Sequence, residues 1–266
     1  MTAKRHDLAL VAGVVAVAVI LALGPSTAAA EPPAVGGAPS TGIAPMTQPP
    51  TTPSTVVLSN ETTVTTWAHP VEEARIREHP ASTSRTIARI RLETEDGLPE
   101  VYLVMSRFTD AEGRVWLCVR VPGRPNGRIG WLGQSALGEL HVTHWLIEVS
   151  LSHRRLRAYY SGKLRFTALV GVGKPSTPTP PGHSWIRERI RVRSRSNPYW
   201  PYALGTSDYS TLTEWPGGGV IGIHSDLGQP QLIPGAPSHG CVRMRDPDIA
   251  WLATRVQLGT PVHIVR

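Results

Sequence analysis

Cysteine and phenylalanine are scarce in this 266-residue chain, which contains only two of each. Two cysteines permit at most one disulfide, so a framework of several bridges is excluded. Eight tryptophans and frequent valines accompany the low phenylalanine content, and this mixture favours short strands over long helices. Glycine and proline each occur 25 times and predict many turns. A chain of this length can bury a sizeable core, in one large domain or in two small ones.

A lipid-modified N-terminus is not expected, because no cysteine stands near the end of the apolar run at residues 8–24. Lys4 and Arg5 precede this run, and three alanines at 28–30 follow it. A basic start, an apolar middle and a small-residue end are the layout of a secretory signal peptide. We therefore predict an exported protein, with residues 1–30 as a signal peptide or a signal anchor. The run is slightly shorter than the about 20 residues that a membrane helix needs, and an uncleaved membrane anchor stays an alternative.

Charged and large apolar residues are nearly absent between residues 31 and 60, where Pro, Thr, Ala, Gly and Ser dominate. Such a segment cannot bury enough surface to offset its chain entropy. We therefore predict a disordered linker over residues 31–60, which separates the leader from the folded part of the chain.

Acidic residues are scarce after position 140. Residues 141–266 carry fifteen basic and seven acidic side chains, whereas residues 31–140 carry ten basic and twelve acidic ones. A positive field attracts anionic partners, and nucleic acid, anionic lipid and a carboxylate-rich wall polymer are the candidates. An exported chain meets little nucleic acid, and the sequence has no matching motif, so we expect no nucleic-acid function.

Alternating short segments between turns predict a mainly β fold with two domains. Residues 115–121 place four aliphatic side chains on one face and lead into a turn cluster at 122–127. Such segments predict a small β-barrel over residues 61–140 and a second β-rich domain over residues 141–266. The apolar spacing after Asp246 predicts a helix that extends to Gln257.

Five arginines recur at every second position in the second domain. Period two in a strand sends alternate side chains to one face, so all five guanidinium groups would share it. The face could bind carboxylates, which arginine pairs well. A solvated outer face is the reading we favour, because charged strand faces ordinarily meet water. The residues concerned are Arg187, Arg189, Arg191, Arg193 and Arg195.

The two cysteines lie in different settings. Cys118 stands within an apolar strand, where a single cysteine behaves as a small hydrophobe. Cys241 stands in a turn-like sequence after His239 and Gly240. A disulfide between Cys118 and Cys241 has to be considered first in an exported protein. A thiol kept free outside the cell is exposed to oxidation, so a chemical use is the natural explanation for Cys241.

A thiol nucleophile needs a base, and His224 stands seventeen residues before Cys241 at the end of an aliphatic strand. The Gly- and Pro-rich loop between them could fold back and bring the two side chains together. Gly240 lets the backbone approach a substrate carbonyl, and the N–H groups of His239, Gly240 and Cys241 are candidate oxyanion donors. Zinc is the alternative for His224, His239 and Cys241, but no fourth ligand stands at zinc-like spacing, and we predict no metal and no cofactor.

Several separate motifs resemble one known family. Residues 221–224 (Ile-Gly-Ile-His), the Gly- and Pro-rich loop, and residues 237–243 (Pro-Ser-His-Gly-Cys-Val-Arg) look like the signature of the L,D-transpeptidases, the YkuD domain. Residues 170–173 and 178–182 resemble the early strands and turn of the same domain. The resemblance spans about residues 142–265, and the motifs occur in the family's order.

The resemblance implies an L,D-transpeptidase β-sandwich with one or two short helices. A motif at residues 127–137 is similar to bacterial SH3-like domains, which implies that the preceding barrel is one of these. Carried over residue by residue, Cys241 is the acyl-accepting nucleophile and His224 the general base. The backbone carbonyl of Ser225 is implied to orient the imidazole. His239 and Gly240 are implied to support the oxyanion pocket, and Ser238 and Arg243 to contact the substrate.

The family's activity implies a cell-wall enzyme outside the cytoplasm, in the wall or the periplasmic space. The Cys241 thiolate would attack the carbonyl after the third residue of a peptidoglycan stem tetrapeptide and release the terminal D-alanine. A side-chain amine of a second stem peptide would then take the acyl group and form a crosslink. β-Lactams of the carbapenem class are the expected inhibitors. A cysteine L,D-carboxypeptidase and a non-catalytic wall-binding protein are the alternatives.

Overall fold

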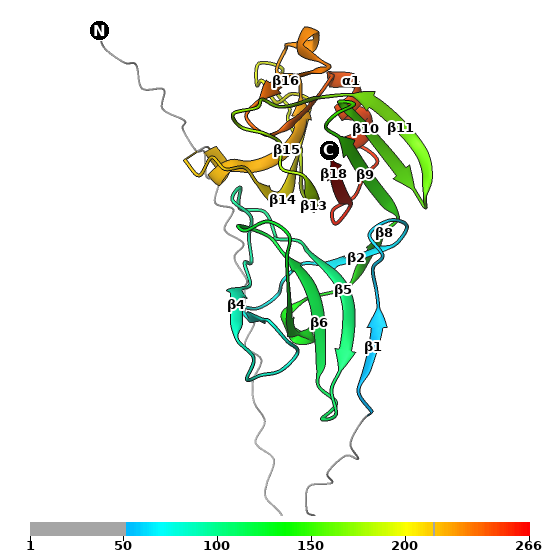
Figure 1. The fold of residues 1–266 in the computed structure, drawn as a ribbon, viewed down its shortest axis with the longest axis vertical. Coiled ribbons are helices and arrows are strands. Elements are labelled where there is room, and N and C mark those ends of the chain that lie inside the picture. The colour runs from blue at the N-terminus through cyan, green and yellow to red at the C-terminus, as the bar shows by residue number, and fades with distance from the viewer. Residues whose placement is uncertain (1–51, 215) are drawn as a thin grey trace, which may run out of the picture. The chain divides into compact units, whose positions relative to one another are not determined.

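The computed structural model describes residues 52–214 and 216–266 (Figure 1). The predicted leader and most of the predicted linker lie outside the described residues. Within the described part of the chain, no helix is long and apolar enough to cross a membrane. The described residues belong to one compact unit that contains two sheets. The mainly β prediction is therefore confirmed.

The first sheet has eight strands in the order β4-β3-β7-β6-β5-β2-β8, with β1 paired to β5. Its core consists of alternate apolar side chains of β5, β6 and β7, as the period-two pattern predicts. The match of this sheet to SH3-like domains stays a prediction. Its strands are β1 (Ser54–Val57), β2 (Thr65–Ala68), β3 (Arg75–Arg77), β4 (Thr86–Arg89), β5 (Tyr102–Thr109), β6 (Val115–Val121), β7 (Arg128–Gly133) and β8 (His141–Thr143), with a 3-10 turn at Gln134–Ala136.

Strand β1 corrects the linker prediction, because Ser54–Val57 lies inside the range expected to be disordered. The strand forms by antiparallel backbone pairing with β5, from Ser54 opposite Thr109 to Val57 opposite Ser106. All four of its residues are exposed, so no buried face marks the strand in the sequence. A strand that forms only by main-chain hydrogen bonds at a sheet edge cannot be predicted from a pattern of buried apolar residues.

The second sheet has ten strands in the order β11-β10-β9-β18-β13-β14-β15-β17-β12-β16. It also carries the helix α1 (Asp246–Ala253) and 3-10 turns at Pro216–Gly219 and Pro230–Leu232. Its strands are β9 (Trp145–Ser150), β10 (Arg155–Tyr160), β11 (Lys163–Leu169), β12 (Gly171–Gly173), β13 (Gly182–Arg191), β14 (Tyr202–Tyr209), β15 (Val220–Ser225), β16 (Gly235–Ser238), β17 (Val242–Met244) and β18 (Pro261–Val265).

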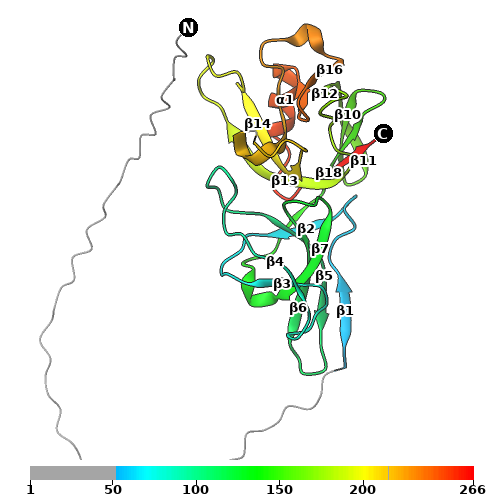
Figure 2. The same ribbon diagram turned by 60° about the vertical axis from the view of Figure 1, so that its left-hand side comes forward.

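Strand β13 joins the two halves of the second sheet. Its first residues pair with β18, and after a register shift beyond Ile186 its remaining residues pair with β14. The sheet thereby folds around one core, and Figure 2 shows α1 between β14 on one side and β10 and β12 on the other. The helix ends at Ala253, four residues before the predicted end. Val256 is fully buried without being helical, which explains why the apolar spacing predicted a longer helix.

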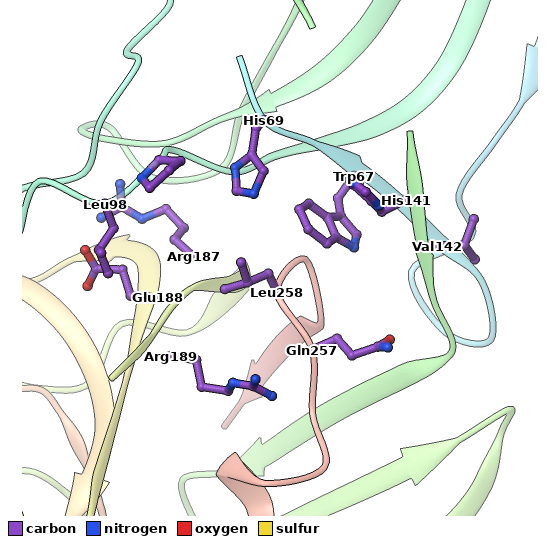
Figure 3. A pocket seen from close by; sticks show the side chains of 11 residues that line it. Trp67, His69, Leu98, His141, Val142, Arg187, Glu188, Arg189, Gln257 and Leu258 are labelled. Carbon is purple, nitrogen blue, oxygen red and sulfur yellow. The ribbon is translucent and has the colours of Figure 1, made fainter. Parts of the chain in front are cut away.

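The two sheets meet in a buried junction. Trp185 Nε1 donates to the Val101 carbonyl at 2.8 Å, and these residues form a small core with Trp67 and Leu103. The chain passes from β8 to β9 with only His144 between them. A cavity of about 500 Å³ lies beside this core and is lined on one side by Trp67, His69 and His141 (Figure 3). We conclude that the first sheet packs directly against the second through this buried core.

The arginine series departs from the expectation of one solvated face. Arg187 is buried, and its guanidinium donates to Glu100 Oε2 at 2.7 Å and to Glu95 Oε2 at 2.9 Å. The register shift in β13 next to this position sets Arg187 apart from Arg189 and Arg191, which are exposed. Arg187 is therefore a junction residue, because both of its carboxylate partners precede β5 in the first sheet.

Candidate active site

Strands β15 and β17 bring Cys241 and His224 to one face of the second sheet. These strands are parallel neighbours, with Ile223 opposite Val242. Cys241 therefore stands next to Gly222, and Gly222 and His224 point to the same face because they are two residues apart. A Cβ atom added to Gly222 would lie 3.8 Å from His224 Cδ2 and 4.0 Å from Cys241 Sγ. Both side chains also line one cavity of about 350 Å³.

The His224 imidazole is buried and held in one tautomer. Its Nδ1–H donates to the carbonyl oxygen of Ser225 at 2.7 Å, because a carbonyl can only accept. Burial and, to a smaller extent, the Arg243 charge lower the pKa of His224 to about 4, against the opposing effect of the Ser225 carbonyl. The imidazole is therefore neutral at pH 7, with Nε2 as a proton acceptor. Ser225 contributes through its backbone; its hydroxyl donates instead to the Pro198 carbonyl at 2.8 Å.

The Cys241 thiol is half-buried and free. Burial raises its pKa, while the Gly222 N–H, which donates to Sγ at 3.3 Å, and the Arg243 charge lower it. The thiol is therefore protonated at rest, next to a neutral imidazole. Nucleophilic attack by such a pair requires the imidazole to take the thiol proton during the reaction.

The turn before Cys241 is fixed by three hydrogen bonds. The Ser238 hydroxyl donates to the Cys241 carbonyl at 2.6 Å and accepts from the Gly240 N–H at 3.1 Å. The Thr179 hydroxyl donates to the Gly240 carbonyl at 2.7 Å. Gly240 has a φ of 130°, and a Cβ there would lie 2.8 Å from Ile221 Cδ1, so only glycine fits.

These contacts refine two predicted roles. The Gly240 N–H is engaged within the turn and is therefore removed from the predicted oxyanion donors, whereas the roles of the His239 and Cys241 N–H groups stay predictions. Ser238 is buried, and its hydroxyl positions the nucleophile; its predicted contact with substrate stays a prediction.

Two cationic groups lie near the motif that carries the thiol, and of these Arg243 acts on the Cys241 thiol by its charge. Lys174 Nζ lies 3.1 Å from His239 Nε2. Arg243 stands opposite His224 in the β15–β17 pairing, and its Nη1 donates to Gln229 Oε1 at 3.2 Å. Its Nε is buried and has no hydrogen-bond partner among the described residues. This arrangement keeps a positive charge beside the reacting groups, where it can attract a carboxylate.

The sequence reading missed several residues of the site. Tyr199 packs edge-on against His224 with 4.9 Å between ring centroids, and burial raises the pKa of its phenol. Thr179 lies in the Pro-rich turn that carried part of the family resemblance, so that motif could have identified it. Lys174 and Tyr199 stand in loops, and no periodicity marks them.

The disulfide alternative to a catalytic thiol is excluded. Cys118 and Cys241 are both free, so they form no disulfide. No group of three or more His, Cys, Asp or Glu side chains in residues 52–214 and 216–266 is arranged to hold a metal ion.

Residues 144–264 match the family model described as the L,D-transpeptidase catalytic domain, YkuD. A Bacillus licheniformis protein provisionally named L,D-transpeptidase YkuD is 36% identical over 118 residues, which are 44% of this chain and 64% of that protein. A Bacillus subtilis protein with the same provisional name is 32% identical over 120 residues, 45% of this chain and 65% of that protein. The chain therefore spans slightly less than two thirds of the length of these curated relatives.

Among solved structures, the catalytic domain from the Enterococcus faecium L,D-transpeptidase is similar to this chain. It is 26% identical, with a TM-score of 0.34, and the match covers 45% of this chain and 95% of that chain.

Proposed function

We propose, from the premise that residues 144–264 are an L,D-transpeptidase catalytic domain of the YkuD family, that this chain crosslinks peptidoglycan stem peptides through a Cys241 thioester. The donor is a tetrapeptide that ends in D-alanine, and the acceptor is the side-chain amine of a second stem peptide. The reaction takes place outside the cytoplasm, in the wall or the periplasmic space, after export through residues 1–30.

The first half-reaction forms the thioester. His224 Nε2 takes the proton of the Cys241 thiol, and sulfur attacks the carbonyl carbon after the third residue of the donor. The tetrahedral oxyanion is stabilised by the N–H groups of His239 and Cys241. The C–N bond then breaks, and D-alanine leaves with the proton that His224 returns to its nitrogen. The enzyme is left acylated on sulfur, with neutral His224.

The second half-reaction reverses these roles. His224 accepts a proton from the acceptor amine as its nitrogen attacks the thioester, and the Cys241 thiolate leaves and recovers that proton. The product is an amide between two third residues. Arg243, beside the thiol, would hold the carboxylate of the leaving D-alanine.

The observation that carries the proposal is the pairing of a free thiol with a neutral imidazole whose Nδ1 is fixed by Ser225. The Gly222 N–H of β15 donates to Cys241 Sγ at 3.3 Å. The Ser238 hydroxyl donates to the Cys241 carbonyl at 2.6 Å and fixes the turn that carries the thiol. A thiol poised for acyl attack is also open to β-lactams, so carbapenems should acylate Cys241.

The test compares the full chain with Cys241→Ala on purified tetrapeptide muropeptides, with an added amine acceptor. Wild type should release D-alanine and form crosslinked product, and Cys241→Ala should form neither. Cys118→Ala is the matched control and should keep both. Hydrolysed tripeptide without crosslink would assign a carboxypeptidase. Product formation by Cys241→Ala would exclude the thioester route, and the absence of any product from wild type would favour a non-catalytic wall-binding protein.

A further inference from the structure

Two glycines lie in a row across the second sheet, between the thiol and a buried carboxylate. Glu188 is opposite Gly205 in the β13–β14 pairing, and Gly205 is opposite Gly222 in the β14–β15 pairing. Gly222 is next to Cys241, as described above. Paired residues on neighbouring strands project from the same face, so this row is a furrow without side chains, closed at its ends by Glu188 and Cys241. All four residues line the cavity of about 350 Å³ that holds the thiol.

The Glu188 side chain bends into this furrow. Its carboxylate lies over Gly205, where a Cβ atom would overlap Oε2 and would stand 3.1 Å from the Glu188 Cβ. Glycine at position 205 is therefore needed for the carboxylate to point toward Gly222 and the thiol. The neighbouring Arg187 extends in a different direction, toward its partners in the first sheet (Figure 3).

Among the described residues, the Glu188 carboxylate forms no ion pair, because the guanidinium of the neighbouring Arg187 bonds to Glu95 and Glu100 instead. Glu188 is 4% exposed, and its Oε1 has no hydrogen-bond partner within the described part of the chain. Burial raises the pKa of Glu188, and the charges of Asp96 and Glu95 raise it further, against the opposing effects of the Thr94 hydroxyl and the Arg187 charge. A buried carboxylate with an unused oxygen is costly, and such groups are normally satisfied by a donor. A hydrogen-bond donor for Glu188 Oε1 would therefore have to come from a ligand in the cavity that holds the thiol.

The first sheet supplies a second acid at the same end of the furrow. Asp96 lines the thiol cavity, although it lies in the loop between β4 and β5 of the first sheet. The loop is held in place by Glu95, which accepts hydrogen bonds from Arg187 and from the Tyr209 hydroxyl. The acidic end of the cavity therefore depends on the junction between the two sheets.

We propose that Glu188, assisted by Asp96, is a specificity subsite that binds the side-chain ammonium group of the donor stem's third residue. The proposal rests on the function proposed above, because the acceptor amine in that function belongs to the third residue of a stem peptide, and a donor stem of the same kind carries this diamino acid on Cys241. The Cys241 sulfur lies near Gly222 and the carboxylate lies over Gly205, so they are separated by roughly one to two strand spacings, about 5 to 10 Å. A diamino-acid side chain that starts at the thioester carbonyl spans a distance of this order along the furrow.

The geometry favours the donor's ammonium group over the acceptor's. The acceptor amine has to reach the thioester carbonyl, lose a proton to His224 and react. An amine bound at Glu188 would be charged and too far from that carbonyl. Arg243 at one end and Glu188 at the other give the site opposite charges, which would orient a donor that carries a carboxylate and an ammonium group.

The test uses two synthetic tetrapeptides with D-alanine at the fourth position and lysine or Nε-acetyl-lysine at the third. Wild type should release D-alanine from the lysine peptide with a kcat/KM about 10- to 100-fold higher than from its acetylated twin, as expected for a charge-assisted hydrogen bond. Glu188→Gln should bring this ratio to about one, and Asp96→Asn should lower it by a smaller factor. Glu139→Gln removes an exposed acid outside the cavity and should leave the ratio unchanged.

Calorimetric binding of both peptides to Cys241→Ala, with and without Glu188→Gln, tests the subsite without turnover. A tighter Kd for the lysine peptide that depends on Glu188 supports the subsite even if wild type releases no D-alanine, and that outcome contradicts only the proposed function. Equal Kd values for the two peptides, no binding of either peptide, or a preference that survives Glu188→Gln overturns the subsite. Thermal unfolding of each variant shows that the ratio is measured on folded protein.

Discussion

The two cysteines lie in regions that raise the thiol pKa alike but differ in the groups beside the sulfur. Cys118 lies in β6 of the first sheet, 9% exposed, and burial raises its pKa against the effects of Ser106 and Arg120. Burial also raises the pKa of Cys241. Both thiols are therefore protonated, and only Cys241 has a cavity and a neutral imidazole beside it. Under the function proposed above, the neighbouring imidazole and the access to the cavity, rather than a low thiol pKa, would therefore make Cys241 the reactive thiol.

Removing the base should produce the largest effect, because it makes Cys241 resemble Cys118. His224→Gln should lower the rate of Cys241 acylation by a β-lactam by about 10²- to 10⁴-fold, the range of general-base catalysis. Mass spectrometry of the intact protein over time measures this rate. His153→Gln alters a histidine that contacts the Ser150 hydroxyl at 2.9 Å and should leave the rate unchanged. Rapid acylation of His224→Gln would contradict the assignment of the base.

The pH profile should reveal the burial of the base. Because burial lowers the pKa of His224 to about 4 from 6.5, the imidazole stays neutral and able to accept a proton throughout the range above pH 4. Cys241 acylation should therefore be nearly constant from pH 7 to pH 5 and fall only as the pH drops through about 4. At pH 5, an exposed imidazole would be mostly protonated and inactive as a base. A midpoint near 6.5 in stopped-flow acylation rates would show that His224 is solvated.

The smallest effect is expected at the other thiol. Cys118→Ala removes a buried sulfur, and we expect it to lower the free energy of unfolding by about 1 kcal/mol without changing the rate of Cys241 acylation. Urea unfolding gives the first quantity and β-lactam titration the second. A thiol reagent applied to the native protein should label Cys241 alone; labelling of Cys118 at a similar rate would remove the contrast between the two regions.

Sequence reasoning predicted that Cys241 and His224 lie close together because each stands in a short motif, and the pairing of β15 with β17 brings the two motifs side by side. The same reasoning misjudged Arg187, whose strand pattern predicted a shared arginine face. A register shift in β13 and two carboxylates from the first sheet bury its guanidinium instead. Neither cause is local, since Arg187 and Glu100 are 87 positions apart in the chain. Strand β1 was missed for a related reason, because its pairing with β5 leaves no hydrophobic signature.

The sequence by itself determined the mainly β class, its motifs carried the resemblance to the YkuD domain, and it selected Cys241 and His224 as the candidate catalytic pair. Each of these follows from alternation or from residues close together in a motif. Only the tertiary structure decided that Glu188, Gly205, Gly222 and Cys241 form one row, and that Asp96 of the first sheet lines the same cavity. Strand pairing and the packing of two sheets create these neighbours, and one chain's local pattern does not encode which distant strands will be adjacent.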